Sequence, residues 1–159
     1  NINSLSQKYS VRKLDENDVD IIYDMSCKND IFYQYHPPFV TRESILDDMG
    51  ALPPGKGYDD KFYVGFFEND SLVGLMDLIL DYPEKEISFI GLFMTDTRYQ
   101  NRGVGSGIIS DVILCLKSSG YKEIRLGVDK GNPQSYSFWT KNKFTPIRED
   151  TYILMGLRI

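Results

Sequence analysis

The chain has 159 residues and a formal net charge of −5, with 42% hydrophobic and 26% charged residues. This length and composition are typical of one globular domain and exclude collagenous, coiled-coil and disordered chains. No apolar run approaches the roughly 18 residues of a membrane span, and residues 1–4 lack the features of a secretory signal peptide. We therefore expect one domain over residues 1–159, located in the cytoplasm and without a membrane partner.

The cysteine and histidine content gives no sign of disulfides or metal. Cys27 and Cys115 are too few for a disulfide framework, and His36 is the single histidine. None of the three stands at metal-ligand spacing, so we expect no metal site.

Charge is distributed unevenly along the chain. Residues 1–60 carry 6 Lys or Arg and 11 Asp or Glu, residues 61–95 carry 2 and 6, and residues 96–159 carry 10 and 6. The net charges are therefore −5, −4 and +4, which favours a cationic ligand near the first two parts and an anionic ligand near the last. An acidic chain argues against nucleic acid as a partner.

Residues 9–14 alternate between polar and apolar and predict a first strand. Asp15 is placed to cap a helix whose apolar face holds Val19, Ile21, Ile22 and Met25. After a loop that contains residues 36–38, Thr41 begins a second helix, which ends near Gly50.

Three apolar, β-rich runs follow, over residues 62–67, 72–80 and 87–95, and Asn69-Asp70 predicts a hairpin turn between the first two. The spacing of apolar residues then predicts a helix that begins at Val104 and stops at Gly120.

A strand over residues 124–128, a short helix opened by Asn132-Pro133 and two short β runs over residues 144–147 and 152–157 complete the chain. The order predicts an α+β fold with a mostly antiparallel first half. Residues 87–128 form one right-handed parallel crossover in it.

A glycine-rich segment, Gln100 to Gly107, lies between a predicted strand and a predicted helix. Free backbone N–H groups at a helix N-terminus form an anion site, and glycines at 103 and 105 let an anion approach closely. Arg98 and Arg102 add positive charge, and the alternative is a tight helix entry without a ligand. The lysine of a nucleotide P-loop is missing, and the glycine spacing differs from that of a dinucleotide fingerprint.

The segment does match Gln/Arg-x-x-Gly-x-Gly/Ala, over residues 100–105. Residues 132–144 match, in part, a second motif, Asn-x-x-Ala-x-x-Phe-Tyr-x-x-x-Gly-Phe. Together, in this order and spacing, they resemble the GNAT superfamily of acyl-CoA-dependent N-acyltransferases, in its bacterial small-molecule type. The resemblance implies a central mixed, mostly antiparallel sheet of six or seven strands flanked by about four helices.

The resemblance also implies acetyl-CoA as co-substrate. In that family the loop amides hold the CoA pyrophosphate, and the preceding strand pairs its backbone with the pantetheine arm and polarises the thioester carbonyl. The residues implied to bind acetyl-CoA are Phe93, Met94, Thr95, Gln100, Asn101, Arg102, Gly103, Val104, Gly105, Ser106, Asn132 and Trp139.

The second motif departs from the family at two positions. Trp139 replaces a tyrosine that protonates the leaving thiolate in many relatives, and an indole cannot do so at neutral pH. Either Tyr136 on the same helix substitutes for it, or the thiolate leaves unassisted with a water nearby. Lys143 replaces a glycine, so we expect Asn142 to take the left-handed conformation.

An amine acceptor must lose a proton before it attacks, so a base is needed. Where some relatives carry a carboxylate, this chain has Phe89. Asp77 interrupts an apolar strand, where burial would raise its pKa, although a solvated strand position is the alternative interpretation. Glu86 is the next candidate.

The acceptor is expected to enter from the side formed by residues 23–58 and 81–85. The local excess of acidic residues suits an amine. Aromatic residues that offer flat walls for the substrate there are Tyr33, Tyr35, Tyr58 and Tyr82.

The leading hypothesis is an N-acetyltransferase that moves an acetyl group from acetyl-CoA to a primary amine of a small molecule or peptide. Direct attack in a ternary complex is expected, because no cysteine is placed as an acyl carrier. The alternatives are a CoA-binding regulatory module without turnover and a dinucleotide-binding fragment, which lacks its second half. Relatives often dimerise, so the resemblance also implies a possible homodimer.

Overall fold

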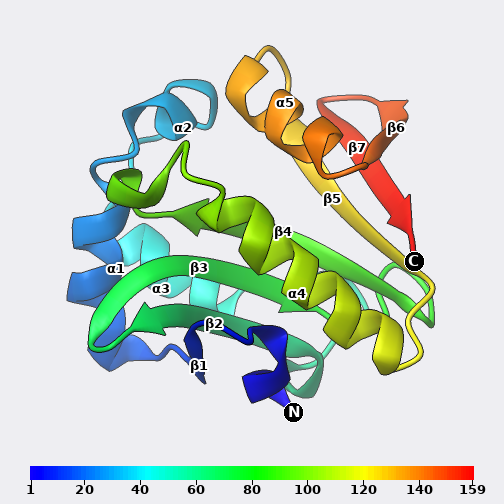
Figure 1. The fold of residues 1–159 in the computed structure, drawn as a ribbon. Coiled ribbons are helices and arrows are strands. Elements are labelled where there is room, and N and C mark those ends of the chain that lie inside the picture. Colours follow the sequence, from blue (N-terminus) through cyan, green and yellow to red (C-terminus); the bar gives the residue numbers. More distant parts are fainter.

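The computed structural model describes residues 1–159, which form seven strands and five α-helices (Figure 1). The strands are β1 (Ser10–Lys13), β2 (Lys61–Glu68), β3 (Ser71–Ile79), β4 (Ile87–Thr95), β5 (Glu123–Asp129), β6 (Thr145–Glu149) and β7 (Tyr152–Arg158). The α-helices are α1 (Val19–Ser26), α2 (Asp30–Tyr35), α3 (Arg42–Gly50), α4 (Val104–Ser118) and α5 (Pro133–Lys141). Four short 3-10 helices are η1 (Ile2–Leu5), η2 (Glu16–Asp18), η3 (Tyr58–Asp60) and η4 (Thr97–Tyr99).

All seven strands belong to one sheet in the order β1-β2-β3-β4-β5-β7-β6. Every neighbouring pair is antiparallel except β4 and β5, which are parallel and joined through α4. The predicted α+β fold with one crossover is therefore confirmed. The hairpin between β2 and β3 turns at Asn69, whose φ of 55° is the left-handed value that asparagine tolerates.

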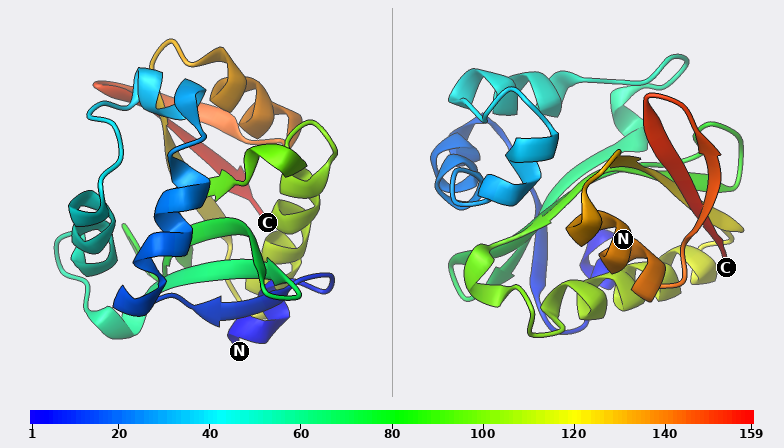
Figure 2. Two further views of the ribbon diagram at one scale, coloured as in Figure 1. Left: turned by 90° about the vertical axis from the view of Figure 1, so that its left-hand side faces the viewer. Right: turned by 90° about the horizontal axis from the view of Figure 1, so that it is seen from above.

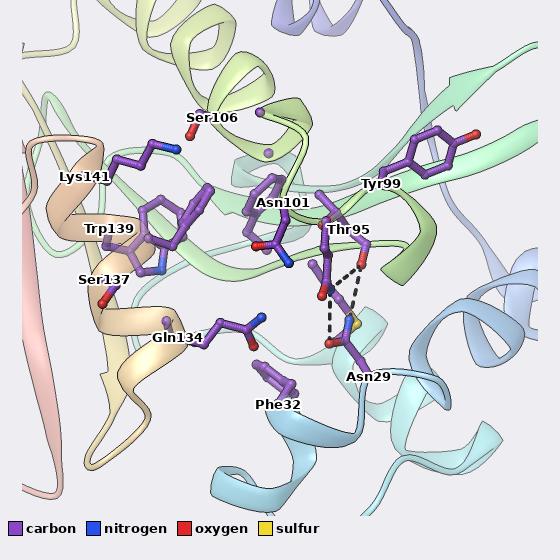
Figure 3. Close-up of a pocket in the computed structure, with 17 residues that line it drawn as sticks. Asn29, Phe32, Thr95, Tyr99, Asn101, Ser106, Gln134, Ser137, Trp139 and Lys141 are labelled. Carbon is purple, nitrogen blue, oxygen red and sulfur yellow. Dashed lines mark hydrogen bonds between the residues drawn. The ribbon is translucent and has the colours of Figure 1, made fainter.

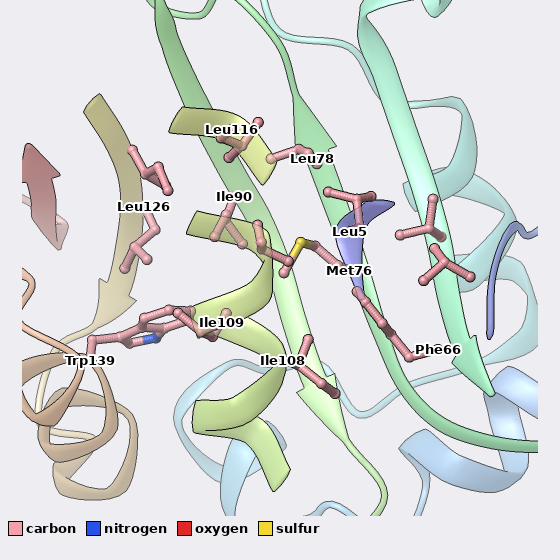
Figure 4. Packing of buried hydrophobic residues seen from close by; sticks show 14 of the residues in the cluster. Leu5, Phe66, Met76, Leu78, Ile90, Ile108, Ile109, Leu116, Leu126 and Trp139 are labelled. Carbon is pink, nitrogen blue, oxygen red and sulfur yellow. The ribbon is translucent and has the colours of Figure 1, made fainter. Parts of the chain in front are cut away.

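Helices cover both faces of the sheet (Figure 2). α1, α2 and α3 lie on one face, and α4 and α5 lie on the other. The larger core is on the α4 face, where four apolar residues of α4 are buried against strand residues such as Met76, Leu78 and Leu126 (Figure 4). The four residues are Ile108, Ile109, Val112 and Leu116. A second core packs Ile22 of α1 and Ile45 of α3 against the opposite face. No helix is both long and apolar enough to cross a membrane.

Local capping fixes where the helices around the later site begin. The Thr41 side chain accepts from the Ser44 N–H, and the Thr41 N–H donates to the Ser44 hydroxyl oxygen, so α3 starts with a reciprocal cap. Asn132 accepts from the Ser135 N–H, and Pro133 fills the first helical position of α5.

Three local expectations were wrong. The stretch expected to be loop before residue 36 contains α2, which buries no residue and therefore shows no apolar stripe in the sequence. Ile21 does not belong to the apolar face of α1, because it is 38% exposed. At the end of α5, Lys143 rather than Asn142 is left-handed, with φ of 76°. The left-handed conformation of Lys143 lets the Phe144 N–H donate a hydrogen bond to the Trp139 carbonyl.

Ile109 lies on the buried face of α4 and is fully buried. Its replacement should destabilise the protein far more than replacement of an exposed residue of the same helix. Ile109→Ala removes buried methyl groups and leaves a cavity, so we expect a loss of about 2–5 kcal/mol in the free energy of unfolding. Leu114 is 56% exposed, so Leu114→Ala should change it by less than about 0.5 kcal/mol. Urea denaturation followed by circular dichroism measures both, and equal losses would contradict this packing.

Candidate functional site

The sheet opens between β4 and β5. The two strands pair over four residues, from Ile87 with Glu123 to Ile90 with Leu126, and then part. Beyond this point β4 stays paired with β3 up to Thr95, and β5 stays paired with β7 up to Asp129. The result is a wedge-shaped opening within the sheet, between the carboxyl ends of two parallel strands.

Backbone groups of β4 face this opening. Asp96 donates its N–H to Val73 on the β3 side, and alternation along a strand then turns the N–H and C=O of Thr95 and Phe93 toward the gap. The Thr95 carbonyl accepts from Asn29 Nδ2 at 3.2 Å and Gln100 Nε2 at 3.3 Å. The Thr95 N–H and both Phe93 groups have no neighbouring strand to pair with, so they remain available to a ligand.

A bulge in β4 lies beside a carboxylate. Asp77 is opposite Leu92 while Leu78 is opposite Ile90, so Gly91 is an extra residue on β4. A Cβ at Gly91 would lie 3.2 Å from Asp77 Oδ2. The absence of a side chain at 91 therefore makes room for the carboxylate against β4.

The glycine-rich segment forms the N-terminus of α4. Asn101 and Gly103 have positive φ values of 62° and 77°, and Gly103 caps the helix without a side-chain hydrogen bond. The N–H groups of Val104, Gly105 and Ser106 precede the first intrahelical bond, and no protein atom accepts from them. Together with the helix dipole, these N–H groups provide the geometry that an anion site requires.

The opening and the helix terminus border one cavity of ≈ 480 Å³ (Figure 3). Residues of four segments line it: Asn29, Phe32, Phe93, Met94, Thr95, Tyr99, Gln100, Asn101, Gly103, Gly105, Ser106, Gln134, Ser135, Ser137, Phe138, Trp139 and Lys141. A long ligand with an anionic group at one end can lie in it, because the anion site and the free edge of β4 are continuous.

Aromatic rings form the wall of the cavity nearest α5. The Phe93 ring lies 6.0 Å from that of Phe138 and 5.9 Å from that of Trp139, centroid to centroid. Trp139 also meets the buried Phe144 edge-on at 5.1 Å. These contacts link β4 to α5 across the place where strand pairing stops.

Most residues implied to bind the co-substrate lie in this cavity, but Arg102, Val104 and Asn132 do not line it. Asn132 is 2% exposed, and its side chain is used to cap α5. Arg98, expected to add positive charge, is paired with Asp96 at 3.0 Å.

Sequence reasoning missed a cation and the contribution of α2. Lys141 lines the cavity together with Gln134 and Phe138, and the three residues are spaced so that they share one face of α5. Lys141 could therefore have been predicted from the position of Phe138 once α5 was assigned. Asn29 and Phe32 gave no signal, because the short helix that carries Phe32 was not predicted.

The three candidate catalytic residues lie in different places. Glu86 precedes the first residue of β4, whereas Thr95 is the last residue of that strand. Tyr136 is 37% exposed and does not line the cavity. Asp77 lies on the α1–α3 face, where Oδ2 accepts from the Lys61 ammonium at 2.9 Å and Oδ1 is buried without a partner. Burial raises the pKa of Asp77, and the neighbouring Lys61 charge opposes this.

The expected substrate tyrosines are also separated. Tyr33 and Tyr35 are on α2, and burial raises the pKa of Tyr33. Tyr82 packs edge-on against Phe89 near the start of β4, far along the strand from Thr95. His36, which follows α2, contacts Asp129 at the end of β5 at 3.0 Å, so this segment spans the wide end of the opening.

Comparison with known proteins agrees with this geometry. The model of the acetyltransferase (GNAT) family matches residues 24–144. An acetyltransferase from Thermus thermophilus is 17% identical and superimposes with a TM-score of 0.80, covering 96% of this chain and 97% of that chain. The PaiA N-acetyltransferase from Thermoplasma acidophilum, in complex with coenzyme A, gives 18% identity and a TM-score of 0.71, covering 94% and 98%.

The ribosomal-protein-S18-alanine N-acetyltransferase from Escherichia coli is 15% identical, with a TM-score of 0.67 and coverage of 94% and 93%. A sequence search of curated proteins gives no match. At such low identity the structural neighbours show the fold alone, whereas the family model covers more than half of the chain. This chain belongs to the acetyltransferase (GNAT) family.

Proposed function

We propose that this protein transfers an acetyl group from acetyl-CoA to a primary amine by direct attack in a ternary complex. The observation that carries the proposal is the unpaired edge of β4 beside three free N–H groups at the start of α4. This combination offers main-chain partners to an extended arm and a cradle to a pyrophosphate.

In this proposal acetyl-CoA has one orientation in the cavity. The pyrophosphate binds the N–H groups of Gly105 and Ser106, which line the cavity together with the positively charged Lys141. The N–H group of Val104, at the first position of α4, adjoins them. The pantetheine arm then extends along β4 and exchanges hydrogen bonds with Phe93 and Thr95, much as an added strand would. A PaiA N-acetyltransferase of the same fold in complex with coenzyme A supports this choice of donor.

The amine approaches from the α1–α3 face, where acidic residues prevail. Asp77 is the base in this proposal, because it adjoins the Gly91 bulge and burial brings its pKa closer to neutrality. Asp48 of α3 adds negative charge nearby, and the pKa of its carboxyl is raised by loss of hydration and by the charge of Asp77.

The chemical step follows from these positions. Asp77 takes a proton from the ammonium, and the amine lone pair attacks the thioester carbon, whose oxygen a β4 N–H polarises. The C–S bond then breaks with its electron pair on sulfur. Neither Cys27 nor Cys115 lines the cavity, which supports direct transfer without an acyl-enzyme.

A CoA-binding module without turnover is the second candidate. It is favoured by one observation, that Trp139 stands in the cavity where a proton donor is expected. Calorimetric titration with acetyl-CoA and CoA, followed by a screen of primary amines for free-thiol release, separates the two. Binding with thiol release supports the enzyme, binding without release for any amine supports the module, and the absence of binding contradicts both.

A side chain at Gly105 should block the co-substrate. Its Cβ would already lie 3.0 Å from the Phe138 ring, so Gly105→Leu fills the cavity next to the anion site. We expect at least about a 100-fold rise in the calorimetric Kd for CoA, because the leucine side chain occupies the space beside the N–H groups and keeps the pyrophosphate from reaching them. Gly107→Leu is the matched control, since a Cβ there meets no atom within 4 Å. Equal affinity of the two variants for CoA would overturn the cradle.

Asp77→Asn should remove the acidic limb of the pH–rate profile. Only ionised Asp77 accepts a proton, so the wild-type kcat rises with pH through a pKa above that of an ordinary aspartate. The variant should lose about 100-fold in kcat on the plateau and keep its CoA affinity. Asp70→Asn, in the exposed turn between β2 and β3, serves as control. An unchanged limb in Asp77→Asn would remove Asp77 from the mechanism.

A further inference from the structure

Trp139 has an unused hydrogen-bond donor inside an otherwise buried side chain. The residue is 7% exposed, yet no protein atom accepts from its indole N–H. The only buried side-chain polar atoms without a partner are Asp77 Oδ1 and Ser88 Oγ. Trp139 Nε1 is therefore not fully buried, and Trp139 lines the cavity. Figure 3 shows the nitrogen edge of the ring turned to the side where Ser137 and Gln134 lie.

Trp139 and Asp77 flank the same short part of β4 from different sides. Asp77 lies beside Gly91 on the α1–α3 face. Trp139 contacts the Phe93 ring and belongs to the core on the α4 face. A thioester lying in the opening alongside residues 91–93 would meet the amine and its base on one side and the indole on the other.

We propose that the Trp139 indole N–H donates a hydrogen bond to the sulfur of CoA and stabilises the leaving thiolate. This inference rests on the proposed acetyl transfer. Sulfur suits the place, since thioethers and thiolates are polarisable and pack well against rings such as Phe93 and Phe138. A donor held in an apolar wall also gains strength when charge develops on its acceptor.

The indole stabilises the thiolate without protonating it. As the C–S bond breaks, the electron pair stays on sulfur, and the N–H bond of Trp139 remains intact. The thiolate takes its proton from solvent, and the amine nitrogen has given one proton to Asp77 and the other to solvent. The release of CoA therefore needs no titrating acid, and Tyr136 has no part in it, in agreement with its position outside the cavity.

The chain contains one tryptophan, so its amide correlation spectrum holds one indole N–H signal. We expect saturating CoA to move this signal downfield, and the shift to grow as the pH is raised through the ionisation of the bound thiol. Desulfo-CoA, which lacks the sulfur, should bind without this pH-dependent shift. Identical spectra with both ligands would overturn the inference, whereas failure of both to bind in calorimetry would overturn the proposed function instead.

Kinetics of Trp139→Phe provide the second test. The variant keeps an aromatic ring and loses the donor, so kcat should fall by about 10- to 100-fold while the Kd for CoA changes little, and the pKa of the bound thiol should rise. Phe144→Leu disturbs the same packing without removing a polar group and should leave that pKa unchanged. Equal pKa values of the bound thiol in the wild type and in Trp139→Phe would contradict the proposal. If the variant fails to fold, the spectra of the wild type with CoA and desulfo-CoA decide the question.

Discussion

The opening between β4 and β5 is the constraint on which the rest of the site depends. A sheet interior normally pairs every backbone group, because a buried unpaired N–H or C=O is costly. Here each strand keeps its outer neighbour while the inner ladder stops at Ile90 and Leu126. The Thr95 carbonyl is satisfied by two side-chain amides, those of Asn29 and Gln100. The groups that remain free are those that a ligand can use.

Aromatic packing holds the two strands apart. Phe93 on β4 stacks against Phe138 and meets Trp139, and Trp139 in turn rests on Phe144 in the core. Collapse of the opening would displace these rings from their contacts. The Asn142 amide also reaches Ser106 at 3.1 Å and ties the end of α5 to the first turn of α4. The walls of the cavity are thus fixed by core residues as well as by the two loops.

The sequence was sufficient for the parts of the fold and site that depend on local patterns. Periodicity and capping predict the strand over residues 87–95, the glycine-rich turn and the start of α5 at Pro133. Most of the residues that line the cavity belong to these three elements. The partner of Asp77 was not predictable, because Lys61 is 16 residues away and meets it only across paired strands. α2 buries no residue, so its sequence has no helical spacing of apolar residues. Hydrogen bonds at its two ends hold it, from Asn29 to Thr95 of β4 and between His36 and Asp129 of β5.

The outer edge of the sheet has a consequence for how copies of this chain can associate. β6 is exposed along its whole length, and an exposed edge is a template on which another chain can add a strand. Pro146 lacks the N–H that such a ladder needs, and the register shift between Pro146 and Arg148 bends the strand. Charged Arg148 and Glu149 follow. These features make β6 a poor template for strand addition, so aggregation through this edge is disfavoured.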